Sequence, residues 1–271
     1  MKRRAIATVV RRLADCKIEL AAVLLLACGT AAAQLVIGPI AVEFSDKQRV
    51  AAVSVKLDDN AKQPIRLQAE VLRWSQNIAG EAVTQETDEL LVTPPIAELQ
   101  PGQRQVFRLA LRGKRPAPEE LAYRLILEDI SESMASAEVS PGMVINFRMK
   151  HDLPVVVAPV GPVVNLLRWK PCPPEALATA ASTPVKPSAA HSPEACVRLL
   201  NAGNRRVKVQ TLTLTGEGWQ QALPLKDGEN VLAGAEREWR VPLTKGQAGA
   251  SHDVQVNTAR GETLQAEAGG F

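Results

Sequence analysis

The 271-residue chain has few aromatic residues, few cysteines and only three histidines. Aromatic residues make up 3% of it, so we expect a core built mainly from Val, Leu, Ile and Ala. The histidines, His151, His191 and His252, lie in no recognisable catalytic motif. We also find no Gly-rich phosphate loop and no paired-carboxylate signature. These absences agree with a protein that is not an enzyme, and an exported hydrolase is the enzymatic alternative.

An excess of positive charge is absent from most of the chain. The formal net charge is +3 at pH 7, from 32 basic and 29 acidic residues. Residues 1–33 hold six basic and two acidic residues, or +4, so the remaining 26 basic and 27 acidic residues give −1. Phosphate binding depends on clustered Lys and Arg side chains. We therefore expect no nucleic-acid partner.

Residues 1–33 have the three parts of a secretory signal peptide. A basic stretch is followed by the apolar stretch LAAVLLLA at 20–27 and by three alanines at 31–33. The apolar stretch is shorter than the roughly 20 residues that a membrane span requires, and no later segment approaches that length. We predict cleavage after Ala33, export and no stable membrane insertion. The sequence LLAC leaves open a lipoprotein signal processed at Cys28.

Two of the four cysteines lie in the predicted signal peptide, which leaves Cys172 and Cys196. In an oxidising compartment this pair predicts one disulfide. Residues 173–195 are rich in Pro, Ala and Ser, so we predict a flexible insertion closed at its base by the disulfide. A zinc site that adds His191 is the alternative, but the spacing matches no compact zinc pattern and a fourth ligand is missing.

Short alternating segments separated by turn-rich stretches follow one another after residue 34. Such alternation is typical of strands with one buried face. In the first half the segments lie at 50–57, 65–74, 104–111 and 121–130. A second series follows the Pro-punctuated stretch 153–163. We predict an all-β protein with a β-sandwich domain at 34–159 and a second β-domain at 160–271.

The most regular alternation lies at about 142–151. One face of this predicted strand carries only large apolar side chains: Met143, Ile145, Phe147 and Met149. A strand of a half-buried sheet explains the pattern. Deformable Met side chains beside Ile and Phe also suit a surface that accepts several related partners. The alternation by itself does not choose between the two interpretations.

Three motifs between about residue 42 and residue 159 help to interpret this strand. LLVTPPIAELQPGQRQVFRLAL is followed by AYRLILEDI and then by the alternating strand that ends in LPVVVAP. In this order and spacing they resemble the periplasmic chaperones of chaperone-usher pilus assembly. The beginning IGPIAVEF and the motif YRLILEDI are more similar to the archaic branch of that family. The second half of the chain matches only loosely.

The resemblance implies a boomerang of two immunoglobulin-like β-sandwich domains without enzymatic activity. In this family the last strand of the first domain complements a pilin subunit that lacks its final strand. By position, Met143, Ile145, Phe147 and Met149 are the expected donor residues. Added main-chain hydrogen bonds and alternate side chains supply the affinity, without a nucleotide or metal. The implied partners are pilin subunits and an outer-membrane usher in the periplasm, with self-association of the free chaperone left open.

The resemblance also implies basic residues that bind the C-terminal carboxylate of the subunit. The first strand offers no Arg, and the position expected to hold Lys is Pro154. Arg124 in AYRLILEDI is our first choice for this anchor, because the archaic branch keeps an Arg in this YRL context and its strand is expected to neighbour the donor strand. A guanidinium can hold a carboxylate through two parallel hydrogen bonds. Lys150 and Arg108 are the other choices. A solvated strand charge paired with Asp or Glu is the alternative interpretation of Arg124.

An exported immunoglobulin-like adhesion or structural subunit is the alternative function. A pilin-like subunit lacks its last strand and carries an extended N-terminal donor segment. Here the long alternating strand lies in the middle of the chain and a second domain follows it. The order of segments therefore favours the chaperone.

The signal-peptide prediction can be checked by the mass of the exported protein. Cleavage after Ala33 leaves a mature chain that begins at Gln34 and carries no lipid. Intact-mass spectrometry is expected to give the mass of residues 34–271 with one disulfide. A chain that begins at an acylated Cys28 would establish the lipoprotein alternative.

Overall fold

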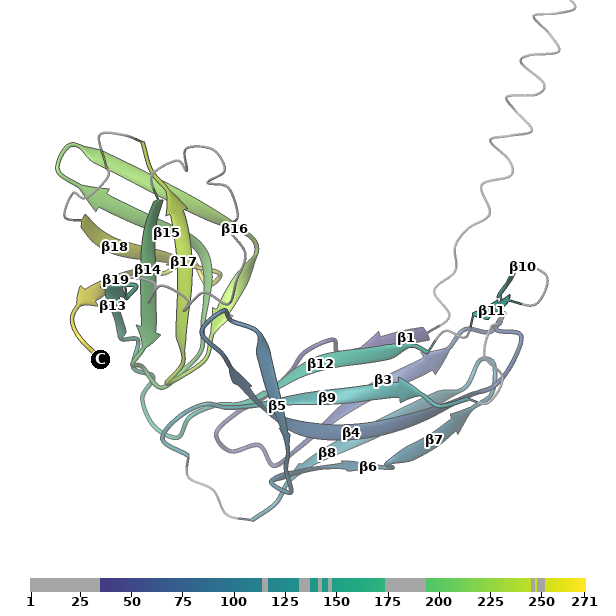
Figure 1. The fold of residues 1–271 in the computed structure, drawn as a ribbon. Coiled ribbons are helices and arrows are strands. Elements are labelled where there is room, and N and C mark those ends of the chain that lie inside the picture. The colour runs from purple at the N-terminus through teal and green to yellow at the C-terminus, as the bar shows by residue number, and fades with distance from the viewer. Residues whose placement is uncertain are drawn as a thin grey trace, which may run out of the picture.

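The computed structural model describes residues 35–113, 117–131, 137–140, 143–145, 148–173, 194–244, 247 and 252–271. Every regular element in these residues is a β-strand, which confirms the predicted all-β class. Two β-bodies meet at an angle and give the molecule the expected boomerang shape (Figure 1). Within the same residues no helix is long and apolar enough to cross a membrane. The predicted signal peptide lies outside them.

The first body is a sandwich of two sheets. One sheet has the strand order β1 (Leu35–Gly38), β3 (Val50–Leu57), β8 (Arg104–Leu111) and β6 (Leu90–Thr93). The other has the order β2 (Val42–Phe44), β12 (Lys150–Val157), β9 (Leu121–Asp129), β4 (Ile65–Gln76) and β5 (Ala82–Glu86), and β7 (Ile96–Leu99) also pairs with β4. Neighbouring strands are antiparallel except β2 and β12, which run parallel.

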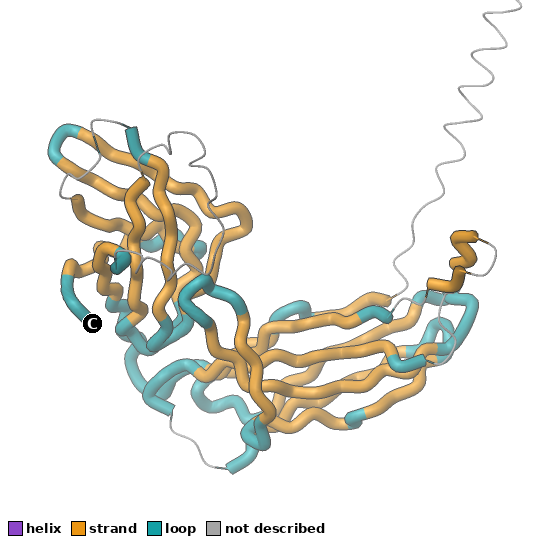
Figure 2. Tube along the Cα trace, viewed as in Figure 1, coloured by secondary structure: helices purple, strands orange, loops and turns teal. Residues whose placement is uncertain are grey.

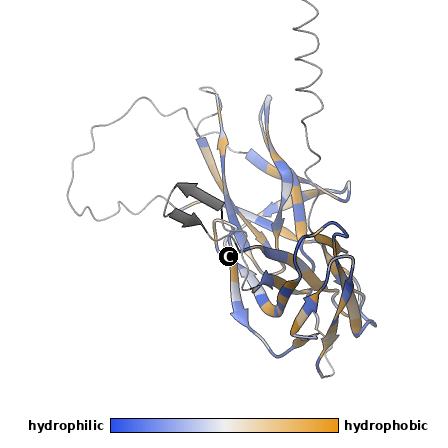
Figure 3. Ribbon diagram, turned by 90° about the vertical axis from the view of Figure 1, so that its right-hand side faces the viewer, coloured by the Kyte–Doolittle hydropathy of each residue, from blue (hydrophilic) through white to orange (hydrophobic). Residues whose placement is uncertain are grey.

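The core of the first body follows from alternation along its strands. In β4 the residues Leu67, Ala69 and Val71 are buried, whereas the polar residues between them are exposed. Tyr123 and Phe107 are fully buried at the centre of the same cluster. Hydrophobic and hydrophilic residues alternate along many strands in Figure 3. Each sheet of this body therefore has one face available for other contacts.

The second body contains one seven-stranded sheet that encloses its own core. Its order is β16 (Trp219–Val231), β15 (Val207–Gly216), β18 (His252–Thr258), β19 (Thr263–Ala268), β13 (Leu167–Pro171), β14 (Glu194–Asn201) and β17 (Glu236–Pro242). The predicted domain boundary at 159/160 lies between β12 and β13. Loops gather at the ends of the strands, including the elbow between the two bodies (Figure 2). Most of the predicted insertion, residues 174–193, is outside the described residues.

The predicted continuous strand at 142–151 is interrupted in the structure. Met143–Ile145 forms β11, which pairs with β10 (Ala137–Ser140) in a separate hairpin, and β12 begins only at Lys150. The neighbouring strand β9 ends at Asp129, whose N–H donates to the carbonyl oxygen of Met149 at 2.9 Å. β10 and β11 form a two-stranded sheet of their own, so Met143–Ile145 is not part of the six-stranded sheet that contains β12.

An apolar cluster and several hydrogen bonds join the two bodies. Trp74, Ala122 and Val156 of the first body pack against Leu232 and Ala235 of the second. The side-chain amide of Gln76 donates to the carbonyl oxygen of Asn230 at 3.0 Å and accepts from the N–H of Leu232 at 2.9 Å. The N–H of Glu238 donates to the carbonyl oxygen of Ile78 at 2.9 Å. The contact includes the turn between β4 and β5 (Figure 1).

An ion-pair network lies beside this cluster. Arg206 of the second body pairs with Glu120 at 2.7 Å and also with Glu43. The side chain of Glu120 is only 5% exposed. A buried carboxylate that loses its partner is strongly destabilising. Arg206 therefore both links the two bodies and compensates the charge of Glu120.

The substitution Arg206→Met is expected to lower the free energy of unfolding by about 3 kcal/mol, because it leaves the Glu120 carboxylate without its cation. Urea denaturation followed by tryptophan fluorescence measures this change. The control Arg112→Met removes an exposed pair with Asp88, for which we expect less than about 1 kcal/mol. Equal losses in the two variants would contradict the role given to Arg206.

Candidate functional site

The outer face of β12, β9 and β4 carries the first-choice anchor residue. The strand register places Arg124 of β9 between Pro154 of β12 and Leu72 of β4. In the next row, closer to the second body, Val156 pairs with Ala122, and Trp74 packs with both. This row belongs to the apolar cluster between the bodies. Arg124 therefore lies one row away from the contact between the two bodies, on the strand next to β12.

Arg124 makes two contacts on this face. Its guanidinium carbon lies 3.8 Å from the centre of the Trp74 ring. Its Nη1 lies 3.5 Å from a carboxylate oxygen of Asp152, which is on β12. The side chain of Arg124 is 18% exposed and that of Asp152 is 48% exposed. The pairing with Asp agrees with the alternative interpretation of Arg124 as a paired strand charge, and leaves its role as an anchor untested.

The structure separates the other two anchor choices. Lys150 is exposed at the beginning of β12, opposite Glu128, on the same sheet as Arg124. Arg108 is exposed on β8, where its neighbours are Ala52 and Thr93, and so belongs to the other sheet. The geometry therefore brings Arg124 and Lys150 onto one sheet and places Arg108 elsewhere.

The predicted donor residues precede β12. Met149 is 58% exposed. Met143 and Ile145 belong to β11, whose side chains are not described, and Phe147 lies outside the described residues. The donor role of all four thus remains a prediction, with the exposure of Met149 as its structural support.

One edge of β12 is open along part of its length. Its partner on one side, β9, pairs with all of Lys150–Val157, but β2 on the other side pairs only with Val155, Val156 and Val157. Among the described strands, none pairs with that side of β12 before Val155. Such an edge presents main-chain groups to another strand. Pro154 is the sequence signal for this feature, because proline within a sheet is largely confined to edge strands.

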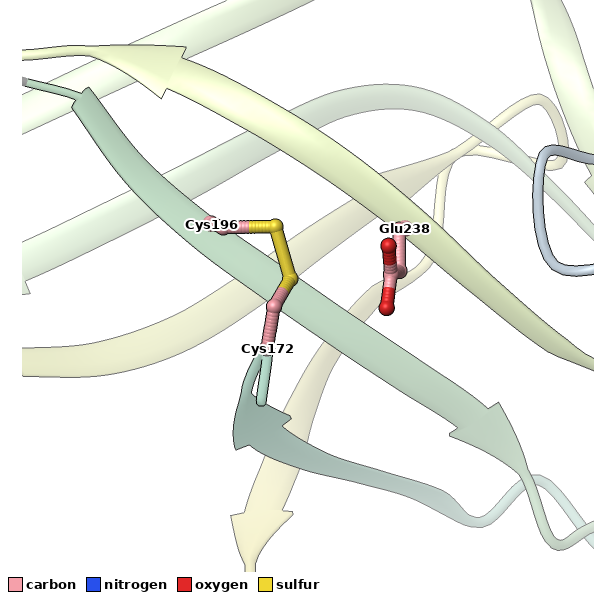
Figure 4. Close-up of side chains that lie close together, drawn as sticks. All are labelled: Cys172, Cys196 and Glu238. Atoms are coloured by element: carbon pink, nitrogen blue, oxygen red, sulfur yellow. A yellow bond between two sulfur atoms is a disulfide. The ribbon is translucent and has the colours of Figure 1, made fainter. Parts of the chain in front are cut away.

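Cys172 and Cys196 are joined by a disulfide, with their Cα atoms 5.4 Å apart, as predicted. The carboxylate of Glu238 lies within 4.8 Å of both sulfur atoms (Figure 4). A metal requires thiolate ligands, whereas these sulfurs are bonded to each other. Glu238 also accepts a hydrogen bond from Nε of Arg198 at 2.7 Å. This cluster is therefore a disulfide beside an ion pair, and His191 lies outside the described residues.

Comparison with known families now adds to this geometry. Residues 34–162 match the family described as the pili and flagellar-assembly chaperone, PapD N-terminal domain. The first sandwich of this chain belongs to this family of pilus-assembly chaperones. The match covers the whole first sandwich, including β9 and β12, and confirms the resemblance found in the sequence. The family is one of chaperones, and the absence of any catalytic activity in this member stays a prediction.

Solved structures share the two-body fold. A chain of the CsuC–CsuE chaperone–tip adhesion subunit complex from the archaic Csu pili of Acinetobacter baumannii has a TM-score of 0.59 and 15% identity, covering 88% of this chain and 100% of that chain. The class 5 fimbriae chaperone CfaA has a TM-score of 0.57 and 12% identity, with coverages of 88% and 100%. At these identities the similarity establishes the fold. The search of curated proteins finds no match.

Proposed function

We propose that this pilus chaperone works in the periplasm, where it captures pilin subunits by donor-strand complementation and delivers them to an outer-membrane usher. The open edge of β12, directly after the exposed side chain of Met149, is the observation that carries the proposal. In this proposal residues 34–159 form the chaperone domain that supplies the donor strand, and 160–271 form the second domain. The Cys172–Cys196 disulfide supports an oxidising compartment, in line with a cleaved signal peptide at 1–33.

Capture follows the physics of strand addition. A subunit without its final strand exposes both an unpaired edge and the apolar groove of its core, and is prone to aggregate. The open edge of β12 provides main-chain donors and acceptors, and the alternating side chains 143, 145, 147 and 149 enter the groove. Burying each such side chain contributes about 1.5–3 kcal/mol. No external energy source is required, because completing the subunit fold is itself favourable.

The same apolar segment explains why the free chaperone is expected to self-associate. Met149 is 58% exposed. In this proposal the apolar side chains that precede it extend this surface, and contiguous exposed apolar surface favours contacts between protein molecules. Two chaperones can cover this surface for each other until a subunit replaces one of them. This interpretation makes self-association and subunit capture mutually exclusive uses of one surface.

Within this proposal Arg124 binds the C-terminal carboxylate of the subunit. It lies on the strand next to β12 and one row from the contact between the two bodies. A carboxylate bound at this point sets the register in which the subunit strand runs along β12, because an alternating strand that slips by one residue presents its wrong face. Lys150, on the same sheet, adds positive charge, whereas the position of Arg108 does not support a shared role.

Donor-strand capture predicts that a charge in the apolar row abolishes the complex. Ile145→Asp or Phe147→Asp places a carboxylate in the subunit core, which costs several kcal/mol without a partner. Each variant is co-expressed with a secreted pilin-like protein encoded at the same locus, and the one-to-one soluble complex is quantified by size-exclusion chromatography. We expect its loss, with unchanged circular dichroism of the free chaperone. Asn146→Asp, on the opposite face of the alternation, is the matched control and is expected to retain the complex. Unfolding of the free variants would support a plain core strand.

The anchor assignment predicts a smaller but measurable loss in Arg124→Ala. Hydrogen bonds to charged groups contribute about 1.5–3 kcal/mol, so we expect affinity for the subunit to fall about ten- to a hundredfold. Recovery of the complex from the periplasm reports this change. Arg108→Ala removes the same charge from the other sheet and is expected to leave recovery unaltered. Unchanged recovery with Arg124→Ala would exclude this residue as the anchor.

A further inference from the structure

We infer that Trp74 is a positioning residue for Arg124, and that Asp152 pairs with the Arg124 guanidinium until an external carboxylate replaces it. The identity of that carboxylate as the end of a pilin subunit rests on the proposed function. The carboxylate site itself rests only on contacts within this chain. It comprises Arg124 as the binding group, Trp74 as its platform and Asp152 as the internal competitor.

Trp74 is a rigid platform. Its side chain is buried, with 5% exposure, and packs in the cluster with Ala122, Val156 and Leu232. The guanidinium of Arg124 lies over this ring at 3.8 Å. A guanidinium stacks on an aromatic face through its own flat face, which leaves its N–H groups free to bind in its plane. Trp74 therefore determines the plane in which Arg124 receives a partner.

The hydrogen bonds of Arg124 indicate what that partner is. A guanidinium has five N–H donors and no acceptor. One Nη1 contact reaches Asp152 at 3.5 Å, at the outer limit of a hydrogen bond. Nε is buried, and it has no hydrogen-bond acceptor among the described residues. Buried donors are normally satisfied, and a carboxylate satisfies two guanidinium donors at once through parallel bonds.

Asp152 is suited to a temporary contact with Arg124. Its side chain is 48% exposed and reaches Arg124 through one long contact. Half-exposed ion pairs of this kind are weak, so an incoming carboxylate with two short bonds displaces it at small cost. Asp152 lies on β12 within the stretch whose edge is open. An added strand and the release of Asp152 therefore occur at the same place.

The second body supports the platform from behind. Leu232 packs on Trp74, and Gln76, two residues further along β4, is hydrogen-bonded to the main chain at Asn230 and Leu232. A change in the angle between the bodies would move Trp74 and with it the guanidinium. The second body thus contributes to carboxylate binding without touching the carboxylate.

Acetate is the probe for this site. The full mature chain, labelled with ¹⁵N, is titrated with sodium acetate, and the Nε–H signal of Arg124 is followed by NMR. Acetamide, and sodium chloride at equal ionic strength, are the controls for the ligand. We expect a saturable shift with acetate only. Trp74→Leu, which keeps an apolar side chain but removes the ring, is expected to weaken acetate binding about tenfold. Trp74→Phe, which retains a ring, is expected to restore part of the loss.

Asp152→Asn is expected to strengthen acetate binding about two- to fivefold by removing the internal competitor. Glu70→Gln is its matched control, because Glu70 and Asp152 flank Ile126 on opposite sides and the change in charge is the same. Its effect is expected to be smaller.

The outcomes separate this inference from the proposed function. The inference is overturned if Trp74→Leu and the unaltered chain bind acetate equally well. It is also overturned if the Nε–H signal of Arg124 does not shift when acetate is added. If subunit complexes still form in that case, donor-strand capture stands without this site. If acetate binds as expected but no subunit complex forms, the site stands and the proposed function is wrong. A purely structural Trp74 would lower thermal stability without changing the affinity of the folded protein for acetate.

Discussion

The antiparallel pairing of β9 with β12 is the interaction on which the proposed binding surface depends. It runs without interruption from Lys150 opposite Glu128 to Val157 opposite Leu121. This register places Leu125 and Leu153 in the core and leaves Arg124 and Asp152 on the outer face. Because side chains alternate strictly along a strand, a slip of β12 by one residue would turn Asp152 toward the core and Leu153 away from it. The anchor and the fold are therefore specified by the same ladder.

Most proteins cover or protect the edges of their own sheets. A chaperone that captures subunits by strand addition has to leave one such edge open. The first body pairs β2 with only the last three residues of β12 and leaves the preceding residues available. The cost is a strand edge and an exposed apolar side chain, Met149, which in an ordinary domain would be an aggregation risk.

Sequence reasoning succeeded where a local pattern determines the outcome. Alternation predicted strands at the positions of β3, β4, β8 and β9, and the lone pair of exported cysteines predicted the disulfide. It did not predict that the strand expected at 142–151 would divide. Met143–Ile145 pairs with β10 in a separate two-stranded sheet, whereas β9 ends at Asp129 and pairs with β12 from Lys150 onward. The length of a neighbouring strand is not visible in the alternation of one segment.

The sequence by itself determined the all-β class, the export signal as a prediction, the family resemblance and the choice of Arg124 as a charge next to β12. Only the tertiary structure decided what surrounds that charge. Trp74 and Arg124 are 50 positions apart in the sequence and meet because β4 pairs with β9. Leu232, further still along the chain, completes the platform from the second body. Alternation assigns a residue to one face of a sheet, but strand register and domain packing determine its neighbours there.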